Sequence, residues 1–186
     1  MLMKIRHYVS ESTLLSIYYA IFSSILTYGS QIFGQIQNIH INRLQKLQDR
    51  SVRLINFAKY NDHRNPLYLN FKILKFSDSI QLSNFLFVHD CIRKNIPLSL
   101  QNSFNLVSNV HNYGTRNALQ YHMALPKIKT KVFGLMSIKY QSSLSWNTLN
   151  SKFNCTTFYD KSRSFCKRFI KDYLINMKNF LLHPLL

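Results

Sequence analysis

Four basic residues recur at the spacing i, i+3, i+7 and i+10 in one short stretch: Arg43, Lys46, Arg50 and Arg53. At 100° per residue, this spacing places all four within an arc of about 80° on one side of an α-helix. Guanidinium and ammonium groups in such a row bind the phosphates of a nucleic-acid backbone without reading its base sequence. We therefore predict that this row contacts nucleic acid.

The opposite side of the same stretch carries the apolar residues. Ile41, Leu44, Leu47, Val52, Leu54, Ile55 and Ala58 fall within an arc of about 160°. This amphipathic pattern predicts a helix over about 39–58 with one face in the core and a basic face outside. Asp49 is the one acid near the basic row.

A second basic group of the same design lies near the C-terminus. Its members are Lys161, Lys167, Arg168 and Lys171. They lie opposite an apolar set that includes Phe165, Phe169 and Ile170, and the pattern predicts a helix over about 157–177. We predict that this group forms a second nucleic-acid-binding surface.

The net charge supports a polyanionic partner for both groups. The chain has 24 Lys and Arg against seven Asp and Glu, a formal charge of +17, yet 46% of its 186 residues are hydrophobic. A disordered basic tail would lack such apolar content. A compact body with this charge repels itself unless an anionic partner neutralises it. RNA, DNA or an RNA–DNA hybrid is the favoured partner, and a membrane surface is the alternative.

Residues for catalysis or metal binding are sparse. The seven acids are scattered and form no pair on one helical face, so two-metal phosphoryl transfer is not expected of this chain. His89, Asp90 and Cys91 are metal-ligand types, but neighbours on a helix point in different directions, and a buried His beside a core Cys is favoured. No catalytic residue, metal site or cofactor is predicted. Three Cys without a CxxC pair favour a reducing, intracellular location, nucleus or cytoplasm.

The chain is predicted to be mainly α-helical, because four Gly and four Pro leave few positions for tight turns. Further helices are predicted over 10–28, capped by Ser10 or Ser12 and ended by Gly29, and over 77–94. Residues 59–76, around Pro66, and 95–118 are predicted to be irregular. A small β element is predicted around 119–140, where Tyr121, Met123 and Leu125 alternate, as do Ile138 and Tyr140.

Residues 14–28 form the most apolar run, but they are too short and too rich in hydroxyls to span a bilayer. We predict a buried helix there and no stable membrane insertion. The N-terminus shows no signal-peptide pattern, and apolar residues already share one helical face at Leu2 and Ile5. The chain is therefore expected to be a fragment.

Several segments resemble, in order, the C-terminal part of jockey-like non-LTR retrotransposon reverse transcriptases. They are the Tyr18-Tyr19 and Tyr28-Gly29 pairs within 4–34, the Leu-Gln-rich segment 44–55, Asp62-His63, Pro66-Leu67, Lys72–Lys75, the HNYGTR motif of residues 111–116, Ser137–Tyr140, Trp146-Asn147, and the basic helix 165–174. The resemblance covers about residues 4–175. Ser142, Ser143 and Ser145 depart from the Gly-Pro and apolar residues usual there, and Phe33 from a more frequent Trp.

The resemblance implies that residues 1–60 belong to a helical thumb that grips the template–primer duplex. Residues 61–186 would then form the connector beyond the thumb. The fingers and palm, with the catalytic Asp pair and its divalent metal, would lie upstream of this chain and would be its missing partners. The chain alone is not expected to polymerise. The alternatives are an independent basic RNA-binding module and a peripheral membrane protein built on residues 12–28.

Overall fold

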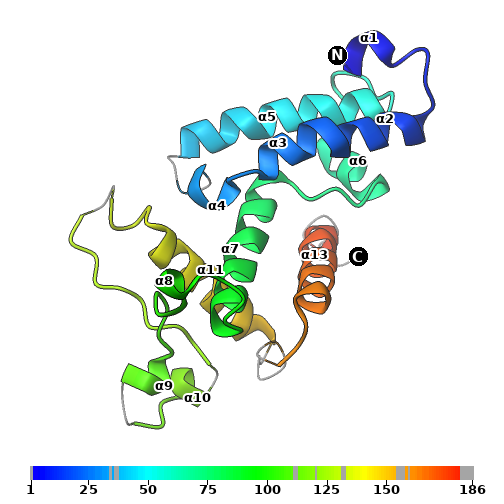
Figure 1. The fold of residues 1–186 in the computed structure, drawn as a ribbon. Coiled ribbons are helices and arrows are strands. Elements are labelled where there is room, and N and C mark those ends of the chain that lie inside the picture. The colour runs from blue at the N-terminus through cyan, green and yellow to red at the C-terminus, as the bar shows by residue number, and fades with distance from the viewer. Residues whose placement is uncertain are drawn as a thin grey trace. The chain divides into compact units, whose positions relative to one another are not determined.

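The computed structural model describes residues 2–33, 35, 38–110, 113–119, 121–130, 133–153, 158 and 160–180. His111 and Cys155 lie outside these residues. The described chain is mainly helical, as predicted (Figure 1). It forms two compact units: residues 1–80 with those from 172 onward, and residues 81–171. The division at residue 60 that the resemblance implies stays a prediction.

The first unit contains the following elements. They are α1 (Leu2–Ile5), α2 (Glu11–Ile17), the π-helix η1 (Tyr18–Ser23), α3 (Ser24–Thr27), α4 (Ser30–Phe33), α5 (Asn38–Ile55) and α6 (Arg64–Asn70). Helix α7 (Phe76–Ile92) begins in this unit and continues into the second one. Helix α13 (Arg163–Phe180) begins in the second unit and ends in the first.

The first predicted helix is confirmed at both ends, but the prediction that it is buried is wrong for its second half, where Ile25 is 70% and Tyr28 is 82% exposed. Ser10 caps α2, because its hydroxyl accepts a hydrogen bond from the Thr13 N–H at 3.3 Å. The helical path continues through η1 and α3, and Gly29 follows with a left-handed φ of 65°. The π-helix was not predicted from the sequence.

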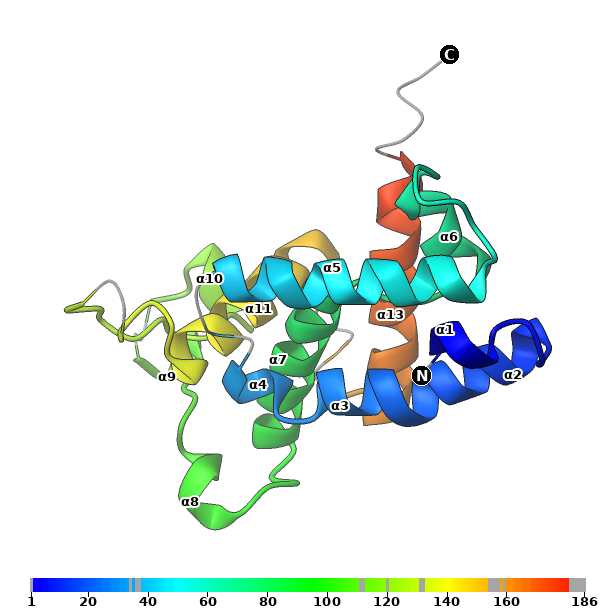
Figure 2. The ribbon, with the colours of Figure 1, turned by 90° about the horizontal axis from the view of Figure 1, so that it is seen from above.

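Helix α5 is the central element of the first unit. Figures 1 and 2 show α1, α2 and α6 beside it, and all three contact it. Tyr18, Val52 and Ile55 form the buried centre of this packing. Helix α6 corrects the prediction of a loop over 59–76: Pro66 is the third residue of α6, where its missing N–H would have no acceptor within the helix.

The second unit is built around aromatic side chains. Its further elements are α8 (Leu98–Gln101), α9 (Val107–Val110), α10 (Arg116–Leu119) and α11 (Ile138–Phe153). Phe85 of α7 stacks on Trp146 of α11 with ring centroids 4.6 Å apart, and both are fully buried. Phe158 meets Phe85 edge to face.

The predicted β element is reduced to one antiparallel bridge, Leu106 to Met123, among the described residues. Ile138 and Tyr140, whose alternation suggested a strand, instead begin α11. Asn147 of α11 binds the opposite edge of the bridged segment: its side chain accepts from the Met123 N–H at 2.7 Å and donates to the Met123 carbonyl at 2.9 Å. A side chain thus satisfies backbone groups that a second strand would otherwise bond.

Candidate nucleic-acid interface

Helix α5 buries polar side chains on the face that the sequence predicts to be apolar. Val52 and Ile55 are buried as predicted, but Leu47 is 53% exposed, whereas Gln48 and Asp49 are buried. The prediction was wrong at the edges of this face: Leu47 is exposed near one edge, and Asp49 is buried beyond the other. Gln48 is accommodated because its amide is satisfied inside the protein. Its Nε2 donates to the Leu74 carbonyl at 2.8 Å and to the Tyr18 hydroxyl at 3.0 Å.

Asp49 is the acceptor at the centre of this buried polar network. Its Oδ1 accepts hydrogen bonds from the Tyr68 hydroxyl at 2.7 Å and from Gln45 Nε2 at 3.0 Å. Its Oδ2 accepts from a guanidinium nitrogen of Arg64 at 2.8 Å. Burial acts to raise the pKa of Asp49, but these three donors and the charge of Arg64 outweigh it and hold the pKa below its usual value. Asp49 is therefore a carboxylate at neutral pH.

The same network fixes the rotation of α5 about its own axis. The Phe76 N–H donates to Gln45 Oε1 at 2.9 Å and to Gln48 Oε1 at 2.8 Å, which ties α5 to the start of α7. Burial raises the pKa of Tyr18 to about 12, so its hydroxyl keeps its proton. With one side of α5 held by directional bonds, the basic row on the other side faces outward in a defined orientation.

This basic row lines one wall of a groove of about 750 Å³, which we call the basic groove. The rest of its lining comes from α1 and the residue that follows it, from the connection between α5 and α6, and from the first residue of α6. The lining residues are Met3, Arg6, Lys46, Asp49, Arg50, Arg53, Leu54, Ala58, Tyr60 and Arg64. Five of them are Lys or Arg and one is an acid, and that acid is already paired with Arg64. The groove therefore attracts anions.

The structure brings together three of the four residues predicted on α5. Lys46, Arg50 and Arg53 line the groove, whereas Arg43 is exposed on the same helix and is not among the lining residues. The sequence did not single out Arg6 or Arg64 for this site. Neither lies on α5, and both reach the groove through tertiary packing. No pattern of spacing in the sequence could have joined them to it.

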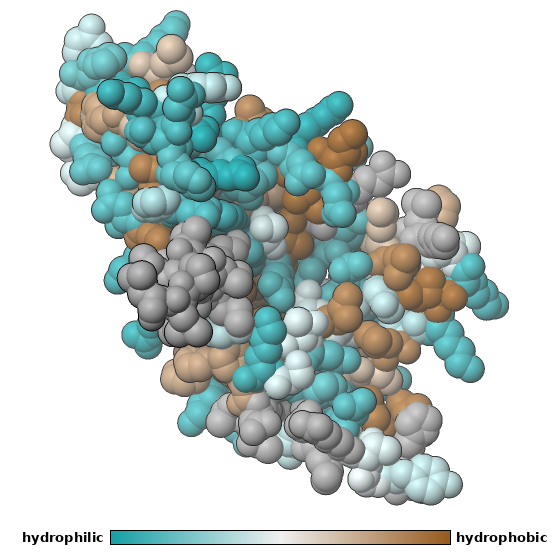
Figure 3. Space-filling view, turned by 180° about the vertical axis from the view of Figure 1, so that it is seen from behind, coloured by the Kyte–Doolittle hydropathy of each residue, from teal (hydrophilic) through white to brown (hydrophobic). Residues whose placement is uncertain are grey.

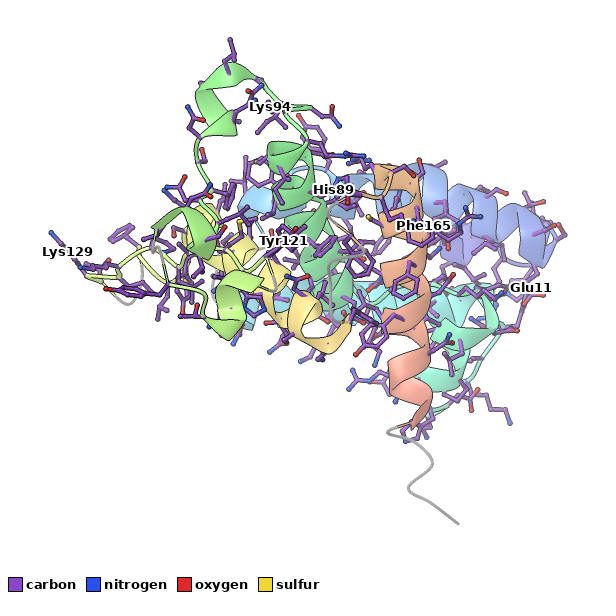
Figure 4. The ribbon with its side chains drawn as sticks, turned by 90° about the horizontal axis from the view of Figure 1, so that it is seen from below. Glu11, His89, Lys94, Tyr121, Lys129 and Phe165 are labelled. Atoms are coloured by element: carbon purple, nitrogen blue, oxygen red, sulfur yellow. The ribbon has the colours of Figure 1, made fainter. Side chains whose placement is uncertain are left out.

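The second predicted group is exposed but not entirely helical. Helix α13 begins at Arg163, so Lys161 precedes it, which corrects the predicted start near 157. Lys167 and Arg168 are exposed on α13, and Lys171 is half-buried. The Lys161 ammonium lies 5.9 Å from the centre of the Phe165 ring, which is labelled in Figure 4.

The cluster His89, Asp90 and Cys91 has structural partners. His89 Nε2 donates to the Lys161 carbonyl at 2.9 Å, and Asp90 pairs with Arg163 at 2.9 Å (Figure 4 labels His89). Cys91 is buried, and burial raises the pKa of its thiol to about 11, so it is protonated at neutral pH. No group of three or more His, Cys, Asp or Glu that could hold a metal ion occurs among the described residues.

No helix in the described part of the chain is long and apolar enough to cross a membrane. Comparisons with protein-family models, with curated proteins and with solved structures found no match to this chain.

Proposed function

We propose that this chain binds the sugar–phosphate backbone of nucleic acid through the basic groove, as the C-terminal part of a non-LTR retrotransposon reverse transcriptase. In this role it grips the template–primer and leaves polymerisation to a palm on another part of the enzyme. The observation that carries the proposal is the gathering of five basic side chains from three segments around one groove. The resemblance over residues 4–175 supplies the enzyme context.

The physical argument rests on unpaired positive charge. Lys46, Arg50 and Arg53 form no ion pair with the residues that the structure describes, so their charges are available to phosphates. Lys46 and Arg50 are separated by about 6 Å along the helix axis, given a rise of about 1.5 Å per residue. Each phosphate that they neutralise releases counterions, which makes binding strongly dependent on salt.

The first prediction concerns the triple variant Lys46→Glu, Arg50→Glu, Arg53→Glu. We expect its affinity for a fluorescein-labelled RNA–DNA hybrid to fall at least about tenfold at 150 mM salt, measured by fluorescence anisotropy. Three lost phosphate contacts should also make the slope of log K against log salt less steep by about 2 to 3. Adding Arg43→Glu tests whether the fourth predicted residue contributes.

The matched control is Lys4→Glu, Lys59→Glu, Lys72→Glu. These three residues are exposed, belong to the same unit, change the net charge equally and do not line the groove. Circular dichroism of every variant checks the helix content. Equal losses of affinity in the groove variant and the control would show that only total charge matters, and the groove assignment would then be wrong.

A peripheral membrane protein is a second candidate, favoured by exposed apolar side chains. Ile25, Tyr28 and Ile32 are all more than 60% exposed. Figure 3 shows hydrophobic residues at the surface among hydrophilic ones. Co-sedimentation with phosphatidylserine vesicles, together with no binding to oligonucleotides, would support this candidate over the first.

A further inference from the structure

Two aromatic rings after α5 lie exposed, each beneath an arginine of the basic groove. The Arg53 guanidinium lies 5.9 Å from the centre of the Tyr60 ring, and that of Arg6 lies 4.9 Å from the centre of the Phe57 ring. Tyr60 is 89% exposed and lines the groove, and Phe57 is 45% exposed. Aromatic rings beside cationic groups are the combination with which proteins hold single-stranded nucleic acid.

The exposure of Tyr60 is fixed by the backbone. Residues 59–62 form a turn: the Asp62 N–H donates to the Lys59 carbonyl at 3.2 Å, and the Lys59 N–H donates to the Asp62 carboxylate at 2.6 Å. Tyr60 is the second residue of this doubly bonded turn, so its ring is carried outward on a constrained loop. A backbone held in this way loses little conformational entropy when a ligand stacks on the ring that it carries.

The two arginines are free to turn toward a ligand without breaking a hydrogen bond at Nε. The Nε atoms of Arg6 and Arg53 are both buried and have no hydrogen-bond partner. A buried donor without an acceptor is unfavourable, so a phosphate oxygen that drew either side chain outward would relieve this cost.

We propose that the basic groove, beyond its contacts with the backbone of a template–primer, also holds a single-stranded stretch, with an unpaired base stacked on Tyr60 and the adjoining phosphates on Arg53, Arg50 and Lys46. Within a duplex, each base is already covered by its neighbours, so an exposed ring can stack only on an unpaired or terminal base. The inference rests on the proposed function, which supplies the phosphate contacts, and adds the class of nucleic acid. The groove volume of about 750 Å³ lies within the range of small-ligand sites, about 300–1,000 Å³.

The test compares two 12-nucleotide single strands of equal charge, an ordinary oligodeoxynucleotide and one made entirely of abasic sites. Tyr60→Ala should weaken binding of the ordinary strand about tenfold, in line with the cost of losing one base–aromatic stack. It should leave binding of the abasic strand unchanged. Tyr60→Phe keeps the ring and should bind both strands like the unmodified protein.

Each outcome separates the inference from the proposed function. If Tyr60→Ala binds the ordinary strand with full affinity, or weakens both strands equally, the base-stacking inference is overturned. The triple variant Lys46→Glu, Arg50→Glu, Arg53→Glu, measured in parallel, should weaken both strands. If it weakens binding of the RNA–DNA hybrid but of neither single strand, the single-strand inference fails. If it weakens binding of none of the three, the proposed function itself fails. Because Tyr60 is so exposed, its removal should leave the folded state intact, which circular dichroism can verify.

Discussion

Asp49 belongs to the buried network of α5 and also lines the basic groove, and its substitution should lower the stability of the fold. Asp49→Ala would leave the buried hydroxyl of Tyr68 without its acceptor and Arg64 without its ion pair, whereas the Gln45 amide keeps Gln48 Oε1 and the Tyr68 hydroxyl as acceptors. We expect the free energy of unfolding in urea to fall by about 1–3 kcal/mol. Asp172→Ala, an exposed acid in the same unit, is the control and should change it by less than about 0.5 kcal/mol. Similar losses in the two variants would contradict a special role for Asp49.

The pKa of Asp49 also fixes the sign of a pH dependence. Because its pKa in the folded state is depressed, folding favours the carboxylate, whose stabilisation is present above the unfolded value of about 3.9. The stabilisation is lost as the pH falls through the folded pKa. Urea unfolding at pH values from 7 down to 3 should therefore show a smaller acid-side loss in Asp49→Asn than in the unmodified protein. If the free energy of unfolding falls equally with pH in the two proteins, the pKa of Asp49 is not depressed.

At the scale of elements, the sequence predicts the helices in which apolar residues recur at helical spacing. It does not predict the helices whose buried residues are polar. The helix predicted over 39–58 is found at Asn38–Ile55. Helix α11 was missed because Ser142, Ser143 and Asn150 are buried beside Trp146, so no apolar period marks it. The sequence does not predict α6, because Pro66 usually interrupts a helix, although the first turn of a helix accepts proline.

Gly29 gives a test of how the first helical segment ends. Its φ of 65° lies in the left-handed region, where a Cβ is unfavourable. We expect Gly29→Ala to lower the free energy of unfolding by about 1 kcal/mol, measured by circular dichroism in urea. Gly114→Ala is the matched control, since no atom lies within 4 Å of a Cβ there and its φ is not left-handed. A loss in Gly114→Ala as large as that in Gly29→Ala would contradict this role for Gly29.

At the scale of the whole molecule, the sequence predicts the mainly helical class and three of the five basic residues that line the groove. Three of the five basic side chains of the groove lie on one helix, where their spacing is visible. Arg6 and Arg64 lie outside α5 and join them through tertiary contacts, which carry no local periodicity. The exposure of Tyr60 depends on the turn at 59–62, whose hydrogen bonds are visible only in the folded chain.

With a net charge of +17, the cations that bind nucleic acid should also repel one another and so lower the stability of the fold. Lys46 and Arg50 are like charges at i and i+4, an arrangement that costs a few tenths of a kcal/mol, and three further cations share their groove. Lys46→Gln with Arg50→Gln should therefore raise the melting temperature by about 1–3 °C at 20 mM salt while weakening nucleic-acid binding.

This gain in stability should shrink at 500 mM salt, because ions screen the repulsion that the substitutions remove. The control pair Lys59→Gln with Lys72→Gln changes the net charge equally in the same unit, outside the groove lining, and should shift the melting temperature less. A lower melting temperature in the groove variant at low salt would show that the two cations stabilise the fold. Their presence in the groove would then be explained by their contribution to stability, and no polyanionic ligand would be needed to explain it.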